Sequence, residues 1–101
     1  MKKQKTNKNG NGSQAIRIEF TDPVAVTVAV AGSFNNWRPE ATPMVRVEQG
    51  RWVKDLALSP GAYEYRLVVD GVWIPDPKVA ETVPNPFGEL NSVLKVNLPG
   101  T

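Results

Sequence analysis

Two of the three tryptophans are the residues best suited to recognise a ligand. Trp37 lies in a polar loop beside two asparagines, and Trp73 follows a tight turn and precedes a proline-rich segment. An indole offers a flat apolar face and one N–H donor, which together suit stacking on the C–H face of a sugar ring. The alternative is that each indole covers one end of the folded core beneath the loops. Trp52 differs, because it is in phase with Leu56 and Leu58 and is predicted to be core.

Arg66 and Asn91 carry polar groups that could complement these rings. The alternation of residues 63–69 places Arg66 on the strand face opposite to Tyr65, seven residues before Trp73. A guanidinium and an amide both hydrogen-bond with hydroxyl groups. Taken alone, however, an arginine on an outer strand face is usually solvated surface, and an asparagine in the position of Asn91 is usually a turn or strand-end residue. These two residues are therefore candidates only in company with the tryptophans.

Catalysis is not expected, because the chain contains no histidine and no cysteine. Their absence excludes thiol nucleophiles, disulfides, a Ser-His-Asp triad and metal sites built on His or Cys, and we expect neither a metal nor a cofactor. Glycoside hydrolysis needs two carboxylates that face each other at roughly 5 to 9.5 Å. The acids near the tryptophans form no obvious pair, and Glu64, which shares the phase of Arg66, is expected to pair with it or flank it. These acids are Glu64, Asp70, Asp76 and Glu89.

The formal net charge of +2 comes from the lysine-rich beginning of the chain. Four lysines precede the first acid, Glu19, and the remaining residues carry eight basic and ten acidic side chains, a net charge of −2. Lysines without interleaved aromatic residues give weak, salt-sensitive attraction to phosphate. We therefore expect no nucleic acid partner.

Residues 1–14 are predicted to form a disordered tail, and residues 15–101 a single domain. No apolar side chain occurs between Met1 and Ala15, so this stretch buries too little surface to offset the entropy of ordering it. It lacks the apolar stretch of a signal peptide, and the chain has no run long enough to cross a membrane. The expected location is the cytoplasm, without a membrane partner.

From Ala15 onward, apolar residues alternate with polar ones at a period of two, which is typical of half-buried strands. Gln49-Gly50 and Asp70-Gly71 predict tight turns, and four prolines exclude a central strand from residues 75–88. About seven short strands without a helical pattern predict an all-β fold, an immunoglobulin-like antiparallel β-sandwich. The predicted strands cover residues 16–20, 24–31, 43–47, 51–58, 63–69, 72–74 and 92–98.

Four motifs in order along residues 16–96 carry a family resemblance. They read GSFNNW from Gly32, YEYRLVVDGVW from Tyr63, DP from Asp76 and FGELNSVLKV from Phe87. The chain resembles the family 48 carbohydrate-binding modules. These include the glycogen-binding domain of the AMP-activated protein kinase β subunit and the N-terminal, early-set domains of branching and debranching enzymes. The resemblance implies a β-sandwich that binds α-1,4-linked glucan, as polysaccharide or oligosaccharide, without catalysis.

The resemblance also implies roles for five residues. Trp37 and Trp73 match the tryptophans that stack on successive glucose rings. Arg66 matches a basic position, usually lysine in the kinase domain, and Asn91 matches an asparagine, and both would hydrogen-bond sugar hydroxyls. Phe87 matches a protruding apolar residue, a leucine in the kinase domain.

Three departures from the family pattern bear on affinity and chain-length preference. Arginine in place of lysine at Arg66 keeps the charge but changes the donor geometry. Phenylalanine in place of leucine at Phe87 either adds stacking area or folds back into the core. Glu89 stands where the kinase domain has a small hydroxyl residue, so it adds an acid nearby.

A protein–protein or spacer module is the alternative function. Modules of this kind accompany glycoside hydrolase family 13 enzymes or kinase complexes, and a catalytic domain or another protein would then be the partner. Exposed aromatic residues also form protein hot spots, so Trp37 and Trp73 do not discriminate by themselves. Their polar company of Arg, Asn and Glu, without clustered Leu, Ile or Met, favours a sugar ligand.

Overall fold

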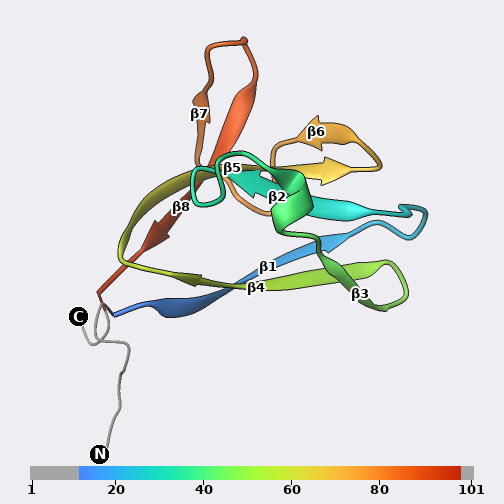
Figure 1. Ribbon diagram of the computed structural model, residues 1–101. Helices are drawn as coiled ribbons and strands as arrows, with labels where there is room; N and C mark the ends of the chain where they lie inside the picture. Colours follow the sequence, from blue (N-terminus) through green and yellow to red (C-terminus); the bar gives the residue numbers. More distant parts are fainter. Residues whose placement is uncertain (1–11, 99–101) are drawn as a thin grey trace, which may run out of the picture.

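Alternating β-branched and polar residues form strands over most of residues 12–98, the part of the chain that the computed structural model describes (Figure 1). Within that part no helix is long and apolar enough to cross a membrane. The predicted tail, apart from residues 12–14, lies outside the described residues, and Gln14 already begins the first strand. The elements are β1 (Gln14–Thr21), β2 (Val28–Gly32), the short 3-10 helix η2 (Pro39–Ala41), β3 (Val45–Glu48), β4 (Arg51–Leu58), β5 (Gly61–Val69), β6 (Val72–Ile74), β7 (Thr82–Pro84) and β8 (Leu90–Val96).

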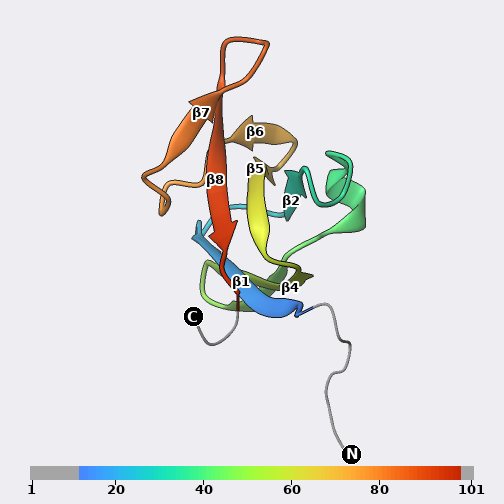
Figure 2. The same ribbon diagram turned by 90° about the vertical axis from the view of Figure 1, so that its left-hand side faces the viewer.

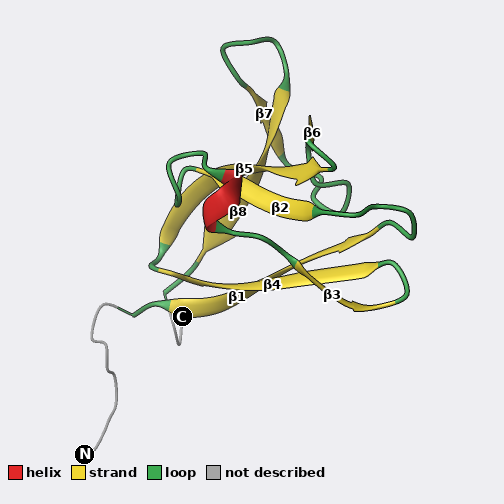
Figure 3. Ribbon diagram, turned by 45° about the vertical axis from the view of Figure 1, so that its right-hand side comes forward, coloured by secondary structure: helices red, strands yellow, loops and turns green. Residues whose placement is uncertain are grey.

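The strands form two antiparallel sheets that face each other, as Figure 3 shows. One sheet has the order β1-β4-β3, and the other has the order β2-β5-β8-β7 with β6 also paired to β5. This confirms the predicted all-β sandwich. The structure has one strand more than the seven predicted, and this additional strand is β7. It lies at a sheet edge inside the proline-rich segment, where the missing N–H of a proline is tolerated.

The long strand β5 organises the five-stranded sheet. One of its edges pairs with β2, and its other edge pairs with β8 through residues 61–65 and with β6 through residues 67–69. Arg66 falls between these two partners. The partner on this edge of β5 therefore changes at Arg66 from β8 to β6. Figure 2 shows β6 and the β7–β8 hairpin above β5.

The core lies between the sheets and contains the residues of β5 that alternate with Arg66. Tyr65 and Leu67 are buried there beside Trp52, so the prediction of a core Trp52 is confirmed. The hydroxyl of Tyr65 donates to Asp76 Oδ2 at 2.5 Å, and Ser92 Oγ accepts from the Asp76 amide at 2.8 Å. Burial and this hydrogen bond raise the pKa of Tyr65. Asp76 is thus a structural group of the core.

The strand predicted over residues 24–31 begins only at Val28, which is a correction. Val24 and Val26 are exposed, although the alternation placed them in phase with Val28 and Val30. The cause is Asp70, whose Oδ1 accepts hydrogen bonds from the amides of Val26 and Thr27 at 2.9 and 2.8 Å. These amides are therefore bound by a side chain rather than by a neighbouring strand.

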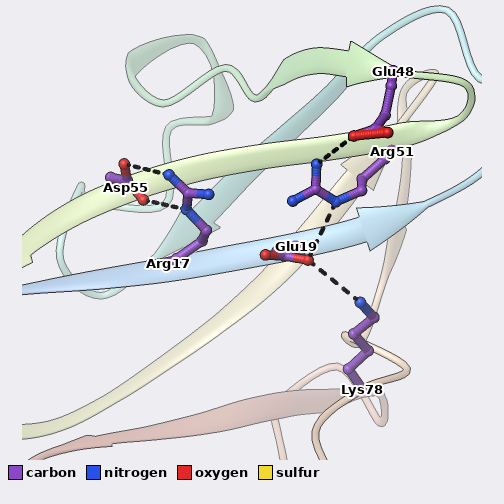
Figure 4. Close-up of polar contacts among 6 residues, drawn as sticks. All are labelled: Arg17, Glu19, Glu48, Arg51, Asp55 and Lys78. Carbon is purple, nitrogen blue, oxygen red and sulfur yellow. Dashed lines mark hydrogen bonds and ion pairs between the residues drawn. The ribbon is translucent and has the colours of Figure 1, made fainter.

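The outer face of the three-stranded sheet carries exposed ion pairs (Figure 4). Arg17 and Asp55 lie opposite each other on β1 and β4, with two hydrogen bonds of 2.7 and 3.1 Å. Arg51 reaches Glu19 at 3.7 Å and Glu48 at 3.1 Å. Exposed pairs of this kind add little stability, so this face is a solvated sheet surface.

Candidate functional site

A hollow of about 710 Å³ opens on the five-stranded sheet, on the face turned away from the core. The structure brings all five predicted residues together around it, from the loop before η2, from β5, from β6 and from the β7–β8 hairpin. Four further residues that the sequence did not assign to the site also line it. The lining is Trp37, Glu64, Arg66, Trp73, Asn85, Pro86, Phe87, Glu89 and Asn91.

Trp37 is held by a loop whose anchor is Asn35. The Asn35 side chain accepts from the amides of Gly32 at 3.0 Å and Arg38 at 3.2 Å, and it donates to Val30 O at 3.0 Å. A second donation, to the Thr42 hydroxyl, spans 2.9 Å. One side chain thus ties together the beginning, middle and end of the loop.

The backbone of Trp37 is in the left-handed region, with φ of 58°, and Asn36 before it has the same φ. Asparagine tolerates this conformation, but a bulky residue there is uncommon and costs about 1–3 kcal/mol. Such a conformation persists only where the surroundings impose it, and here the Trp37 amide donates to Gly32 O at 2.9 Å. The fold therefore accepts strain in order to place this indole at the hollow.

Trp73 lies on β6 directly opposite Val68 of β5. Its side chain is partly exposed, and its carbonyl oxygen accepts a hydrogen bond from Arg66 Nη2 at 3.0 Å. The strand pairing and this bond fix the backbone beneath the indole. The tight turn before it has the positive φ values expected of Asp70-Gly71, 49° and 84°.

Arg66 lines the hollow but is only 8% exposed, so it is not the solvated residue that its position on an outer face suggested. Its Nη2 contacts Glu89 Oε1 at 2.8 Å, and its Nε is buried without a hydrogen-bond partner. Of the two expectations for Glu64, it flanks Arg66 in the lining of the hollow, and the ion pair of the guanidinium is formed with Glu89 of the β7–β8 hairpin. The third guanidinium nitrogen, Nη1, has no hydrogen-bond partner among the described residues. It is also not one of the fully buried nitrogen atoms, so a ligand can reach it.

Asn91 is 5% exposed and sits in a row of side-chain hydrogen bonds. Its Nδ2 donates to Glu64 Oε1 at 3.0 Å, and its Oδ1 accepts from Asn85 Nδ2 at 3.2 Å. The row links β5, β8 and the loop after β7. Asn91 is thus a residue near the beginning of β8, beneath the hollow.

Phe87 stands at the tip of the β7–β8 hairpin and is 89% exposed. Of the two alternatives for this ring, folding back into the core is therefore excluded. The tip is shaped by Asn85, whose Oδ1 accepts from the amides of Phe87 at 2.9 Å and Glu89 at 3.1 Å. Gly88 between them has φ of 82°, a conformation that favours glycine.

Chemically, the hollow combines three aromatic rings with one guanidinium, two carboxylates and two amides. Flat apolar faces beside hydrogen-bonding groups suit a ligand with apolar faces and a rim of hydroxyls. Among the described residues, no three acidic side chains gather as a metal site would require. Sequence reasoning missed the lining role of Glu64, Asn85 and Glu89. For Glu64 a signal was present, since it shares the strand phase of Arg66.

The chain is similar to known proteins. Residues 14–100 match the family model described as the glycogen recognition site of AMP-activated protein kinase. The chain is 26% identical over 87 residues to the amyloplastic phosphoglucan phosphatase DSP4 of Castanea sativa, covering 86% of this chain and 23% of that protein. It is 36% identical over 69 residues to the β-1 subunit of 5'-AMP-activated protein kinase from Rattus norvegicus, covering 68% of this chain and 24% of that subunit.

A solved structure shares the fold. Maltogenic amylase from S. marinus superposes with a TM-score of 0.74 at 19% identity, covering 89% of this chain and 14% of the amylase. The chain thus spans about a quarter of the length of the two relatives above and less of the amylase. Their whole-protein activities are not transferred by this similarity.

Proposed function

The chain belongs to the family of the glycogen recognition site of AMP-activated protein kinase, and from this premise we propose that it binds α-1,4-linked glucan without catalysing a reaction. The observation that carries the proposal is the convergence of Trp37, Trp73 and Phe87 on one hollow beside Arg66 and Asn91. Stacking on aromatic faces supplies apolar contact, and the polar groups select for hydroxyls.

In this proposal, Trp37 and Trp73 stack on glucose rings and Phe87 extends the apolar contact from the exposed hairpin tip. Arg66 uses Nη1, the guanidinium nitrogen that has no partner among the described residues, to donate to a sugar hydroxyl. Asn91 keeps one amide hydrogen and one lone pair beyond its bonds to Glu64 and Asn85. The side chains of Arg66 and Asn91 are fixed by hydrogen bonds within the protein before the ligand binds, which lowers the entropic cost of binding.

The site offers binding without an obvious catalytic device. Its two carboxylates are each held by a donor of the protein, Glu64 by Asn91 and Glu89 by Arg66. A hydrolytic pair needs one acid free to protonate the leaving oxygen and a second acid to act on the opposite face of the sugar. Held carboxylates of this kind suit the orientation of recognition groups instead.

Association with a catalytic or regulatory protein is the second candidate function. The observation that favours it is that two valines outside the hollow are exposed near the Asp70 turn: Val26, whose amide donates to Asp70 Oδ1, and Val72, two residues after Asp70. Exposed apolar side chains that lie together mark contact surfaces more often than single ones do. The two functions use different surfaces and are compatible.

Intrinsic tryptophan fluorescence during titration with β-cyclodextrin tests the first function. We expect Trp37→Ala and Trp73→Ala each to weaken binding at least tenfold, because each variant removes the apolar contact between one indole ring and the glucan. Val45→Ala, on the edge of the other sheet, is the control and leaves the affinity unchanged. Unchanged binding in a folded tryptophan variant would remove that residue from the site.

A further inference from the structure

We propose that the hollow discriminates against phosphorylated glucan through the carboxylates of Glu64 and Glu89. This inference rests on the proposed glucan binding and deepens it, because it names which chemical form of the sugar is selected. Both acids line the hollow beside Arg66, and they are the formal negative charges among its lining residues.

The formal charges of the lining residues do not balance. Two carboxylates face one guanidinium, which leaves the hollow with a net charge of −1. Residues 12–98 carry eight basic and ten acidic side chains, a net charge of −2 that has the same sign as that of the hollow. A neutral sugar is insensitive to the imbalance, whereas a phosphate group with a charge of about −1.5 to −2 at neutral pH is repelled.

Arg66 is poorly placed to compensate for this repulsion. Its side chain is 10% exposed, and its Nη2 is already shared between Glu89 at 2.8 Å and the Trp73 carbonyl at 3.0 Å. Its Nε is buried without a partner and is closed to a ligand, so while Glu89 holds Nη2 only Nη1 is open to a phosphate, and a two-pronged contact is not available. A phosphate would therefore have to displace Glu89 before it could use the guanidinium fully.

Glu89 is the exposed member of the ion pair at the hollow. Its side chain is 57% exposed on the protruding β7–β8 hairpin, above the buried Arg66. Arg38, the cation beside Trp37 in the sequence, is exposed and does not line the hollow. Specificity of this kind arises from repulsion of the wrong ligand rather than from added contacts to the right one.

The test compares two rings, β-cyclodextrin and its derivative with phosphate on every 6-position. Because all seven glucose units of the derivative carry phosphate, rotation of the ring cannot hide the charge. Isothermal titration of the full chain measures the affinity ratio of the two rings. We expect the phosphorylated ring to bind about tenfold or more weakly at low salt, and the ratio to narrow at high salt because repulsion is screened.

Isosteric variants separate charge from size. Glu89→Gln keeps an oxygen that accepts from Arg66, and Glu64→Gln keeps one that accepts from Asn91, so both preserve the hydrogen bonds and remove one charge each. We expect each variant to narrow the affinity ratio about threefold, and the double variant to narrow it further. Glu48→Gln, on the other sheet, makes the same change in total charge and leaves the ratio as it is.

Each outcome is decisive. Equal or tighter binding of the phosphorylated ring by the unaltered chain overturns the inference. So does a ratio that stays constant in Glu89→Gln, in Glu64→Gln and at high salt, because the phosphates would then be excluded by their size. Failure of neutral β-cyclodextrin to bind is a different result, which would refute the proposed function itself.

Discussion

Two faces of this sandwich carry the same kind of ion pair in different settings. On the three-stranded sheet, Arg17 and Asp55 form a bidentate pair whose side chains are 50% and 59% exposed. On the five-stranded sheet, Arg66 and Glu89 form a pair in which the arginine is only 10% exposed and the acid 57%. The first pair lies on a solvated strand face, whereas the second joins a buried arginine of β5 to an exposed acid of the β7–β8 hairpin.

The difference comes from what surrounds each strand. The strands β1 and β4 pair along their whole length, and the ion pair on their outer face is exposed. Along β5 the partner changes from β8 to β6 at Arg66, and loops rise on both sides of it. A concave site therefore forms where strand pairing changes, and the same residue types become recognition groups in one place and surface charges in the other.

The loop that carries Trp37 offers the largest test of this contrast. Asn35→Ala removes four hydrogen bonds, and we expect it to lower the free energy of unfolding by about 2–3 kcal/mol and to weaken β-cyclodextrin binding. Urea denaturation and titration measure the two effects. Asn36→Gly is the control, since glycine keeps the positive φ, and its stability should change by less than about 0.5 kcal/mol. Equal losses in both variants would show that Asn35 is no special anchor.

Variants of Arg66 and Arg17 compare how much a buried and an exposed arginine ion pair each contribute to stability. Arg66→Ala removes packing and the bonds to Trp73 and Glu89, and we expect the free energy of unfolding to fall by about 1–2 kcal/mol. Arg17→Ala removes an exposed pair and should change stability little. Urea denaturation of both variants measures this. A larger loss in Arg17→Ala would reverse the contrast between the two faces.

Phe87 separates binding from stability. Because its ring is 89% exposed, we expect Phe87→Ala to leave the free energy of unfolding within about 0.5 kcal/mol of the unaltered chain. Glucan binding should nevertheless weaken about fivefold, since a stacking surface is lost. Phe87→Leu should retain part of the affinity. Loss of stability together with affinity would indicate that the ring supports the hairpin rather than the ligand.

The smallest expected effect is the pH dependence of the stabilisation that Asp55 provides on the outer face of the three-stranded sheet. The hydrogen bond from Arg17 lowers the pKa of Asp55 from its usual 3.8, so the folded state favours the charged form. The stabilisation is present above the unfolded pKa and is lost as pH falls through the folded pKa. The urea midpoint of Asp55→Asn should lie slightly below that of the unaltered chain at neutral pH and converge with it below about pH 4. A gap that widens in acid would contradict this sign.

Local patterns sufficed for much of the fold. The strand predicted over residues 51–58 coincides with β4, and that over 72–74 with β6, because alternation and turn residues are local properties. The prediction failed at Val26, whose amide is bound by Asp70 more than forty residues later, and at Val24, whose amide is bound by Asp22. A long-range side-chain bond of that kind leaves no trace in a local period.

The sequence identified five residues that line the hollow, but it did not predict which side chains they contact. Motif resemblance pointed to Trp37, Trp73 and Phe87, and the structure places all three at the hollow. The burial of Arg66 and its pairing with Glu89 depend on how the β7–β8 hairpin folds over β5. Alternation reports only the face of a strand, so it could not tell a covered outer face from a solvated one.

The central claim is that one face binds glucan and the other does not, and amide and indole NMR shifts test it most directly. On addition of maltoheptaose to the full chain, the indole N–H signals of Trp37 and Trp73 should shift, together with the Arg66 amide. The indole signal of the buried Trp52 and the amides around Arg17 should stay in place. Shifts confined to the three-stranded sheet, or no shifts at saturating maltoheptaose, would contradict the account.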